Sequence, residues 1–425
     1  MKQRVVIVGG GAGGAELAAT LGRRSQHLNL EVSLVDCATR HFWKPRLHEV
    51  AAGLRGDSEA IPYLALARVN NFHFRLGPLV TLDAKLKTIS LGRVATARGN
   101  TLLGERVLQY DTLVLAFGSQ VNDFGTPGVR EHCLLLDDSE RAFAFQKQLL
   151  EAAVLTSQGV TDRLRIGIVG AGATGVELAA ELSHSISVMR SSCSFMPPDK
   201  LDITLIDMAP RPLANSSPAM SDFATHALQR LGVTLQLNTG VSQVLPDGFL
   251  LKDGNTVPCD LKVWASGVIG HPFAADLNLK LDHSRRIICN SFLRCVGEED
   301  IYAMGDCASV LDPVTNRPLP TTAQVAHQQA GYLLKVLSLK PGATHLKAFQ
   351  YRDRGSLVSL GTESTTGEIP LRKQQALAFK GIFAKFGYLL LQTIHRATLL
   401  GWRRTLVLVL SDALRRTATP PVKLH

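Results

Sequence analysis

The sequence predicts an α/β protein that contains two related βαβ halves and ends in a basic, amphipathic region. A β-branched run, a glycine turn and an alanine-rich helix follow one another over residues 4–24, and the same order returns over 165–185. This repeat, about 160 residues apart, indicates an internal duplication of one supersecondary unit. The 425 residues also exceed the ~250 to 300 at which a single core stops growing, so two or three domains are expected.

The composition excludes a disordered chain and narrows the choice of partners. Hydrophobic residues make up 45% of the chain, which is enough to form packed cores, and charged residues make up 19%. The net charge is +10, but residues 373–425 hold nine Lys and Arg against the single acid Asp412, so the body is nearly neutral. This distribution favours an anionic lipid surface over nucleic acid as the basic end's partner.

The cysteine spacing predicts no metal site. The seven cysteines are scattered without a C-x-x-C pair, so reduced, buried thiols in a cytosolic setting are expected. A strand that already starts at Arg4 leaves no room for a signal or transit peptide. Polar and charged residues interrupt even the most apolar stretch, 388–409, so a membrane span is not expected.

The first glycine motif predicts a dinucleotide site. Gly9, Gly11 and Gly14 form a G-x-G-x-x-G pattern between a strand and a helix. The first glycine suits a tight turn, the second a close approach of the backbone to a pyrophosphate, and the third close packing of helix on strand. Asp36 ends the next strand, 22 residues beyond Gly14, where an acid receives ribose hydroxyls. The alternative is a glycine-rich structural turn.

The second motif repeats this pattern at Gly170, Gly172 and Gly175, and Asp207 ends the strand that follows. The loop over 189–202 explains the longer spacing to this acid. A carboxylate there accepts the 2′ and 3′ hydroxyls and repels a 2′-phosphate, which favours NADH over NADPH, although Arg211 keeps NADPH open. The alternative is that this second unit is only scaffold.

Two further segments fit a flavin site. Residues 301–308, IYAMGDCA, match the strand and Gly305-Asp306 element that grips the ribityl chain of FAD; an Asp N-cap of the next helix is the alternative. Residues 112–119, TLVLAFGS, resemble the strand end that passes under FAD, with Phe117 where Thr is usual.

With these motifs the chain resembles the type II NADH dehydrogenases, the single-subunit NADH:quinone oxidoreductases among the flavoproteins with two dinucleotide-binding domains. The most specific element is 323–328, AQVAHQ, which fits the family's A-Q-x-A-x-Q quinone motif. Residues 41–53 resemble the segment beside FAD, and 263–268 the strand end near the nicotinamide. The resemblance covers essentially the whole chain.

The resemblance implies two Rossmann-like domains with FAD and NADH as cofactors. It implies an FAD-binding domain of residues 1–120 and 285–345, an NADH-binding domain of 121–284 and a membrane-anchoring region of 346–425. The cofactor-binding residues implied are Gly9, Gly11, Gly14, Asp36, Lys44, Val80, Gly118, Gly305, Asp306, Ala323, Lys380, Gly170, Gly172, Gly175, Asp207 and Gly267.

The catalytic residues that the resemblance implies are Glu177, Gln324 and Gln328. Glu177 would lie beside the nicotinamide and quinone; the alternative is a charge that complements the first turn of its helix. Gln324 and Gln328 are one helical turn apart and would hydrogen-bond the quinone; the alternative is a polar face satisfied by backbone. Four histidines lack ligand spacing and are expected to be structural: His41, His48, His327 and His395.

The basic end predicts two amphipathic helices, over 377–395 and 402–416. Basic polar faces with one Trp and long aliphatic side chains describe helices that lie in the lipid headgroup plane, where each cation adds about 1 kcal/mol on an anionic leaflet. The resemblance places such a protein peripherally on the cytoplasmic face of the bacterial inner membrane. The alternative is a helix pair docked on the chain's own core or on a second subunit, so a homodimer is possible.

The expected activity follows from these parts. NADH would transfer a hydride to FAD, and two electrons would pass to a membrane quinone of the respiratory chain without proton pumping. One rival is a sulfide:quinone or other disulfide-type oxidoreductase, which needs a redox cysteine pair at the flavin. The other is a membrane-anchored flavin or NAD sensor without catalysis.

Overall fold

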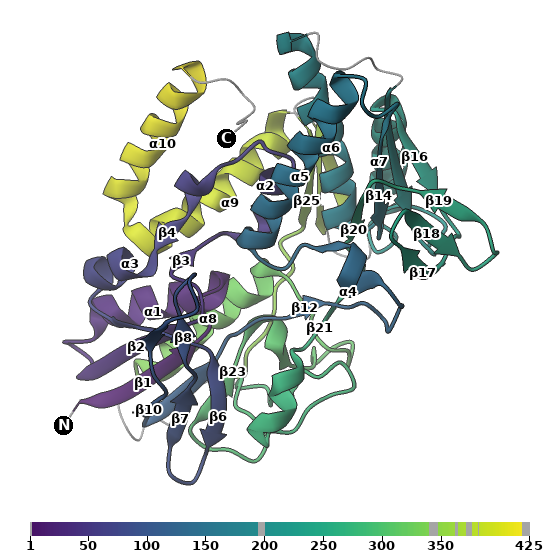
Figure 1. Cartoon of the computed structure of the whole chain (residues 1–425). Helices are drawn as coiled ribbons and strands as arrows, with labels where there is room; N and C mark the ends of the chain where they lie inside the picture. Colours follow the sequence, from purple (N-terminus) through teal and green to yellow (C-terminus); the bar gives the residue numbers. More distant parts are fainter. Residues whose placement is uncertain are drawn as a thin grey trace.

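The computed structural model describes residues 2–193, 200–339, 347–361, 364–370, 376–380 and 382–418 (Figure 1). Two five-stranded parallel sheets form its framework, and the predicted α/β class is confirmed. The first sheet has the order β23-β11-β1-β2-β5, with bounds Ile301–Ala303, Thr112–Leu115, Gln3–Val8, Leu30–Asp36 and His73–Leu76. The second has the order β13-β20-β14-β15-β16, with bounds Leu134–Leu135, Leu261–Trp264, Leu164–Val169, Leu201–Ile206 and Val233–Gln236.

The duplicated units have the same topology. In the first, β1 leads into α1 (Ala12–Arg24) and then β2; in the second, β14 leads into α6 (Ala173–Cys193) and then β15. Both strand pairs are parallel, and the strands are buried runs of Val, Ile and Leu because helices cover the sheets. The domain boundaries at residues 120/121 and 284/285 stay a prediction.

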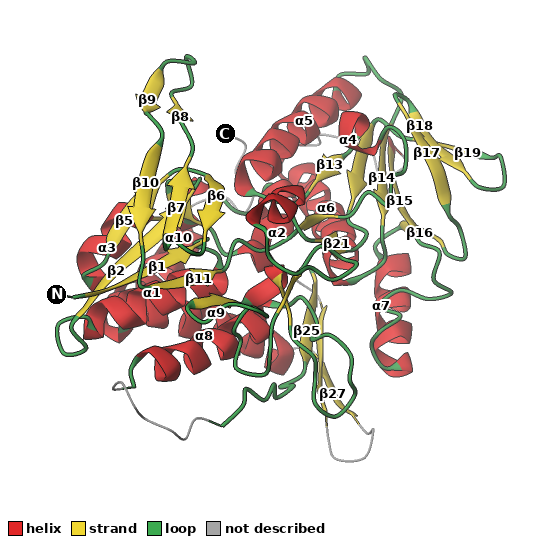
Figure 2. Ribbon diagram, turned by 90° about the horizontal axis from the view of Figure 1, so that it is seen from below, coloured by secondary structure: helices red, strands yellow, loops and turns green. Residues whose placement is uncertain are grey.

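Helices from distant parts of the chain cover the first sheet. Helices α1, α8 (Ala323–Leu337) and α9 (Ile382–Leu400) lie together on one side of its strands (Figure 2). The second sheet packs with α5 (Ser139–Ser157), α6 and α7 (Pro218–Arg230).

Small sheets and short elements complete the fold. The antiparallel sheets are β10-β7-β6 (Arg106–Gln109, Thr88–Leu91, Leu79–Asp83), β17-β18-β19 (Val241–Leu245, Gly248–Leu251, Thr256–Pro258) and β25-β26-β27 (Ser356–Leu360, Ser364–Pro370, Ala376–Lys380). The remaining elements are β3 (Arg40–His41), β4 (Ile61–Pro62), β8 (Val94–Ala95), β9 (Thr101–Leu103), β12 (Gln120–Val121), β21 (Val268–Ile269), β22 (Ile287–Ile288), β24 (Ala308–Ser309), α2 (Leu47–Ala51), α3 (Tyr63–Asn70), α4 (Val129–His132), η1 (Lys44–Arg46), η2 (Asp57–Glu59), η4 (Pro272–Leu277) and η5 (Gly305–Cys307).

The C-terminal region differs from the prediction at its start. Residues 377–380, expected to open a helix, belong to strand β27, which pairs antiparallel with β26. Leu377 and Phe379 alternate with Ala378 and Lys380 in sequence, and a run this short fits a period of two as well as a helical one. The first helix therefore spans Ile382–Leu400, and α10 spans Trp402–Ala418.

The two terminal helices have different surroundings. Helix α9 packs on α1 and α3, and Leu399 is fully buried in the core of the first unit, so docking on the chain's own core describes α9. Helix α10 projects at the edge of the molecule and packs on α9 (Figure 1). Its apolar side chains remain exposed, among them Trp402 at 66%, Leu406 at 62% and Leu414 at 71%. Within the described part of the chain, no helix combines the length and apolar character needed to cross a bilayer.

Candidate active site

The first glycine turn has the geometry that its pattern predicts. Gly9 has φ +105°, and a Cβ on it would lie 2.3 Å from the Ala116 carbonyl oxygen. A Cβ on Gly14 would lie 1.9 Å from the Gly9 carbonyl oxygen, so helix and strand pack too closely for a side chain. Gly11, the N-cap of α1, faces open space, and a Cβ on it would meet no atom within 4 Å. The cradle at the helix N-terminus is thus open for a phosphate group.

The second turn reproduces these three roles. Gly170 has φ +108°, a Cβ on Gly175 would lie 1.9 Å from the Gly170 carbonyl oxygen, and Gly172 again faces open space. The fold itself therefore requires glycine at positions 170 and 175. At position 172 glycine is needed only to leave room for a ligand that approaches the turn.

Each strand-end acid bonds the turn that it follows. The Asp36 carboxylate accepts the Gly10 N–H at 2.6 Å and the Ala38 N–H at 2.7 Å. Asp207 accepts the corresponding N–H groups of Ala171, at 2.5 Å, and Ala209, at 2.7 Å. Burial raises the pKa of Asp36 above its usual value. Both acids are thereby fixed beside their glycine turns, where ribose hydroxyls would reach the remaining lone pairs.

In the sequence, Arg211 left binding of the 2′-phosphate of NADPH possible. In the structure its guanidinium bonds backbone carbonyls instead. Its guanidinium donates to the carbonyl oxygens of Ala214, Ser216 and Ser217 at 3.0–3.3 Å. These bonds hold the loop after β15. They also engage the guanidinium that would otherwise pair with the 2′-phosphate of NADPH.

Asp306 lines a polar cavity between the two units that is partly open to solvent. It belongs to η5, directly after β23, and accepts a hydrogen bond from the Ser119 hydroxyl at 2.9 Å. The cavity, of about 200 Å³, is lined by Ser119, Val268, Ile269, Ser284, Arg286, Asp306 and Thr321. Burial raises the pKa of Asp306. The N-cap alternative is wrong, because the next helix, α8, begins at Ala323 and takes Thr322 as its N-cap.

Two side chains that the sequence analysis missed support this element. Ser119 bonds Asp306, and the Gln329 side-chain carbonyl accepts the N–H of Gly305 at 2.6 Å, where φ is +70°. Gln329 is 1% exposed on the apolar face of α8. A polar residue within an otherwise apolar helical stripe was the signal that could have identified it.

The other residues assigned to cofactor binding are placed as follows. Lys44 is exposed in η1, and its charge acts on both Asp36 and Asp306, lowering their pKa values against burial. Ala323 opens α8, while Gly118 and Gly267 have φ of +78° and +70°. Val80 is exposed in β6, and the Lys380 side chain lies outside the described residues. Lys44 is thus the cation of this set that lies near both FAD-side acids.

Phe117, which stands where Thr is usual, packs within an aromatic cluster. Its ring lies 4.9 Å from that of Phe273 and 6.0 Å from that of His271. The aromatic ring that departs from the family pattern is therefore packed against His271, which precedes η4, and Phe273 of η4.

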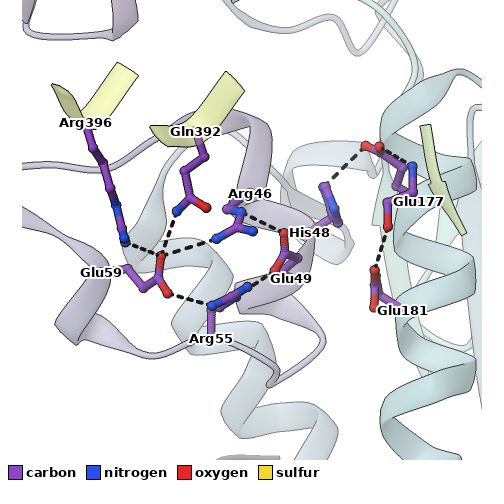
Figure 3. A network of polar contacts seen from close by, with 10 residues as sticks. Arg46, His48, Glu49, Arg55, Glu59, Glu177, Glu181, Gln392 and Arg396 are labelled. Carbon is purple, nitrogen blue, oxygen red and sulfur yellow. Dashed lines mark hydrogen bonds and ion pairs between the residues drawn. The ribbon is translucent and has the colours of Figure 1, made fainter. Parts of the chain in front are cut away.

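Glu177 is buried between α6 and β25 (Figure 3). Its carboxyl accepts the Ser359 N–H at 3.0 Å and lies 3.5 Å from His48 Nδ1. Burial raises the pKa of Glu177 to about 8 and that of Glu181, one turn further on, to about 7. Burial also lowers the pKa of His48 to about 4, so the contact joins two neutral groups at neutral pH.

The helix-dipole alternative for Glu177 does not hold. Helix α6 begins at Ala173, so Glu177 is its fifth residue and not part of the first turn as expected. A carboxyl whose pKa is raised to about 8 is also not a stabilising anion at a helix N-terminus.

An ion-pair network joins this region to α9 (Figure 3). Glu59 accepts from Arg55 at 2.8 Å and from Arg396 of α9 at 3.0 Å, and Arg46 lies 3.5 Å away. Glu49 links Arg55 and Arg46 on the other side, at 2.7 and 3.0 Å. The network fixes the 41–59 segment against α9, and Arg396 continues it to Asp412 of α10 at 2.6 Å.

Gln324 and Gln328 share one face of α8, as predicted, with Nε2 of Gln328 3.4 Å from Oε1 of Gln324. Both amides bond the backbone of 352–355. Gln324 donates to the Gly355 carbonyl at 3.1 Å and accepts the Arg354 N–H at 2.7 Å. Gln328 donates to the Arg352 carbonyl at 2.8 Å and accepts its N–H at 3.0 Å. The backbone-satisfied alternative therefore describes this conformation, and the quinone role stays a prediction.

The described thiols that face each other or lie beside Asp306 are buried and poorly suited to disulfide chemistry, whereas Cys37 is exposed and Cys133 partly exposed, so the predicted burial of the thiols holds only in part. Cys289 and Cys295 face each other across an antiparallel bridge, but both are buried, and the neighbouring thiol and burial raise the pKa of Cys295 well above its usual value. Cys307, next to Asp306, is buried with its pKa raised to about 12. Such thiols do not form the thiolate that disulfide exchange requires. Among the described residues, no three His, Cys, Asp or Glu side chains gather to hold a metal.

Comparison with known proteins agrees with this geometry. Residues 3–330 match the family model of the pyridine nucleotide-disulphide oxidoreductases. The chain is 34% identical to the type II NADH:quinone oxidoreductase of Haemophilus influenzae over the full length of both proteins, and 27% identical to type II NADH:quinone oxidoreductase NdhA of Mycobacterium tuberculosis over 95% of this chain and 84% of that protein. In fold it is similar to NDH2 from Plasmodium falciparum solved with NADH, with a TM-score of 0.79 at 17% identity, covering 95% of this chain and 98% of that one. The chain belongs to the pyridine nucleotide-disulphide oxidoreductases and, within them, to the type II NADH:quinone oxidoreductases.

Proposed function

We propose that this chain oxidises NADH and reduces a membrane quinone, with FAD as its resident cofactor. The observation that carries the proposal is the pair of matching sites in which a glycine, Gly11 or Gly172, opens onto empty space beside a fixed acid, Asp36 or Asp207. One such site suits FAD and the other NADH. When bound, FAD supplies a carrier that accepts two electrons from a nicotinamide and passes them to a quinone.

The residues of the first unit fit FAD. The N-terminus of α1 at Gly11 would donate N–H groups to the pyrophosphate, and Asp36 would bond the adenosine ribose. Asp306 would accept a ribityl hydroxyl in the cavity that it shares with Ser119. Lys44, near both acids, would add positive charge beside the phosphates.

The second unit would bind NADH by the same means. Gly172 leaves room for its pyrophosphate, and Asp207 would accept the two ribose hydroxyls. Because three loop carbonyls engage the Arg211 guanidinium, a 2′-phosphate would meet the Asp207 charge while Arg211 is held by the loop, which favours NADH over NADPH.

Glu177 would hold a proton near the nicotinamide. With its pKa raised to about 8, its carboxyl is largely protonated at pH 7 and can give up a proton when a negative charge develops nearby. His48 and Ser359 orient it between the two units. Its closeness to the nicotinamide rests on the family resemblance.

Gln324 and Gln328 would bind the quinone carbonyls. In this conformation their N–H groups donate to the Gly355 and Arg352 carbonyls, so a quinone oxygen would compete with these two acceptors. Quinone binding at this face therefore requires that the 352–355 segment release at least one amide.

Helix α10 would dock on an anionic membrane surface. It presents exposed apolar residues together with Arg403 and Arg404, also exposed, which suits a helix in the headgroup plane. We place this surface on the cytoplasmic face of the bacterial inner membrane, with contact to a second subunit as the competing use of the same helix.

The visible spectrum of the purified protein tests the proposal. We expect flavin absorbance near full occupancy, bleaching by NADH under anaerobic conditions, and recovery on adding a soluble quinone. Bleaching by sulfide with dithiol formation would favour the sulfide:quinone rival, and bleaching without quinone turnover would favour a sensor. A protein that stays colourless after incubation with FAD would contradict the assignment.

A further inference from the structure

A hydrogen-bonded chain of histidines and one acid crosses the interface between α1, α8 and α9. Glu16 of α1, 5% exposed at its side chain, accepts from His327 of α8 at 2.6 Å with Oε2 and contacts His395 of α9 at 2.7 Å with Oε1. His395 Nε2 lies 2.8 Å from His41 Nε2, and His41 Nδ1 lies 2.8 Å from the Gly10 carbonyl oxygen. The chain thus joins the first glycine turn to the A-Q-x-A-x-Q helix.

The positions of the protons in this chain follow from its inner end. A carbonyl oxygen only accepts, so His41 must donate from Nδ1 to Gly10, and burial lowers the pKa of His41 to about 3. A neutral His41 then has no proton on Nε2, and His395 must donate to it from its own Nε2. With its proton on Nε2, a neutral His395 would offer only a lone pair at Nδ1, and a carboxylate oxygen also only accepts. One further proton must therefore lie between His395 Nδ1 and Glu16, and these two residues share it.

The outer end of the chain is His327. Its side chain is 40% exposed, its Nδ1 bonds Glu16, and none of the described residues hydrogen-bonds its Nε2. The hydrogen bond and charge of Glu16 raise the pKa of His327, while the charge of Arg354 opposes this. A carboxylate behind Nδ1 with a free Nε2 in front is the arrangement by which enzymes hold a histidine for proton transfer.

His327 is also placed next to the residues proposed to bind quinone. It is three positions after Gln324 and precedes Gln328, so it borders the same face of α8. The inner cavity of about 20 Å³ beside His41 and His395 has room for little more than one water molecule and is too small for a quinone ring. The substrate end of the chain is therefore the His327 end.

We propose that His327 is a catalytic residue that donates a proton to the quinone, and that Glu16, His395 and His41 are positioning residues that hold its Nε2 toward that substrate. The inference rests on the proposed function. NADH, quinone and one proton give NAD⁺ and quinol, so one proton per turnover must come from solution. In that step the N–H bond at His327 Nε2 breaks and a quinone O–H bond forms; neutral His327 then recovers its proton from water at its exposed edge.

The test compares two acceptors in the full-length, FAD-loaded enzyme. Ferricyanide takes an electron without a proton, whereas a soluble quinone needs both. We expect His327→Ala to lower kcat with quinone about 100-fold or more while turnover with ferricyanide stays within about two-fold of wild type. Added imidazole should restore quinone turnover in this variant, and kcat should respond rather than KM.

A second variant and a matched control keep the test decisive. Glu16→Gln removes the charge behind His327, so the fall of quinone turnover at alkaline pH should begin at lower pH than in wild type. If buried Glu16→Gln does not fold, half-exposed His327→Ala still gives the answer. Tyr332→Phe, which removes a hydrogen bond to the Lys347 carbonyl from the same helix, should match wild type in every assay.

Three results would overturn the proposal: full quinone turnover in His327→Ala, an equal loss with both acceptors, or no response to imidazole. The last two would make the chain a structural clamp. Absence of quinone turnover in the wild-type enzyme would instead contradict the proposed function, since ferricyanide turnover and flavin content are measured in parallel.

Discussion

The main-chain N–H of Ser359 donates to the Glu177 carboxyl at 3.0 Å, and this bond joins strand β25 of the C-terminal region to helix α6 of the second nucleotide unit. The Ser359 hydroxyl contacts Glu181 at 3.4 Å, so one residue bridges two carboxyls with raised pKa values. The segment that follows the quinone motif thus contacts the acid assigned to the nicotinamide side.

The buried protonated carboxyl of Glu177 should make stability depend on pH. Its pKa is about 4.5 in the unfolded chain and about 8 in the folded protein, so the folded state binds more protons between these values and the free energy of unfolding falls as pH rises through them. The slope is at most about 1.4 kcal/mol per pH unit for one proton. Glu177→Gln should lose this contribution, so its melting temperature relative to wild type should rise from pH 5 to pH 8. An unchanged difference would contradict the raised pKa.

The two open glycines should separate the two nucleotide sites. Gly11→Ala and Gly172→Ala both place a methyl in empty space, so both proteins should fold normally. We expect Gly11→Ala to lose bound flavin, and Gly172→Ala to keep its flavin but raise KM for NADH by about 10-fold or more, equivalent to about 1.4 kcal/mol. Gly14→Ala is the contrasting variant, because its methyl would lie 1.9 Å from a carbonyl oxygen and should prevent folding of the turn.

Gln324→Ala should raise the apparent KM for quinone while anaerobic flavin reduction by NADH keeps its rate. The same change removes two hydrogen bonds to the 352–355 segment, each worth about 1 kcal/mol, and should lower the melting temperature by a few degrees. Slower flavin reduction would place this residue on the nicotinamide side and refute its assignment.

Removal of α10 should release the protein from anionic liposomes. A chain ending at residue 400 keeps α9, which is docked on α1 and α3, but loses Arg403, Arg404 and the exposed apolar side chains. Flotation with vesicles at low and high salt measures the effect, and NADH:ferricyanide turnover checks that the body is intact. Undiminished binding to the vesicles would exclude α10 as the anchor.

Glu59→Gln should destabilise the protein by about 3–5 kcal/mol, because Glu59 is the shared partner of Arg46, Arg55 and Arg396 in a buried network. The matched control is Asp57→Asn, two residues earlier. The Asp57 side chain is 62% exposed, and its partner Arg40 also lies in solvent. That change should cost less than about 1 kcal/mol. Similar urea midpoints for the two variants would contradict the predicted contribution of the Glu59 network to the free energy of unfolding.

The sequence predicted the nucleotide units well because their signals are local. Gly9, Gly14 and their counterparts act through close contacts within one βαβ unit, and Asp36 ends the adjacent strand, so fixed spacings carry the information. The contiguity of strand and loop also led to the assignment of Asp306, whose role toward the ribityl chain stays a prediction.

The partners that arise from tertiary packing could not be predicted in this way. Gln329 meets Gly305 across a loop, Ser359 meets Glu177 across 182 positions, and Glu16 meets His395 across 379. Strand β27 was missed because its pairing with β26 outweighed the helical pattern of its own residues. Two of the four histidines expected to be structural, His327 and His395, hydrogen-bond Glu16, an acid that no spacing rule connects to them.

The contacts of the last turn of α9 have a consequence for synthesis of the chain. Asn70 donates to the Leu399 carbonyl and Arg23 to that of Thr398, both at 2.9 Å, and the Leu399 side chain fills the core of the first unit. The amino-terminal unit therefore leaves the ribosome with its core incomplete and waits for more than 300 further residues, exposing apolar surface meanwhile. Chains that terminate before Leu399 should accumulate as aggregates or protease substrates, so that a frameshift in the codons of α9 would be as damaging as one near the start of the gene.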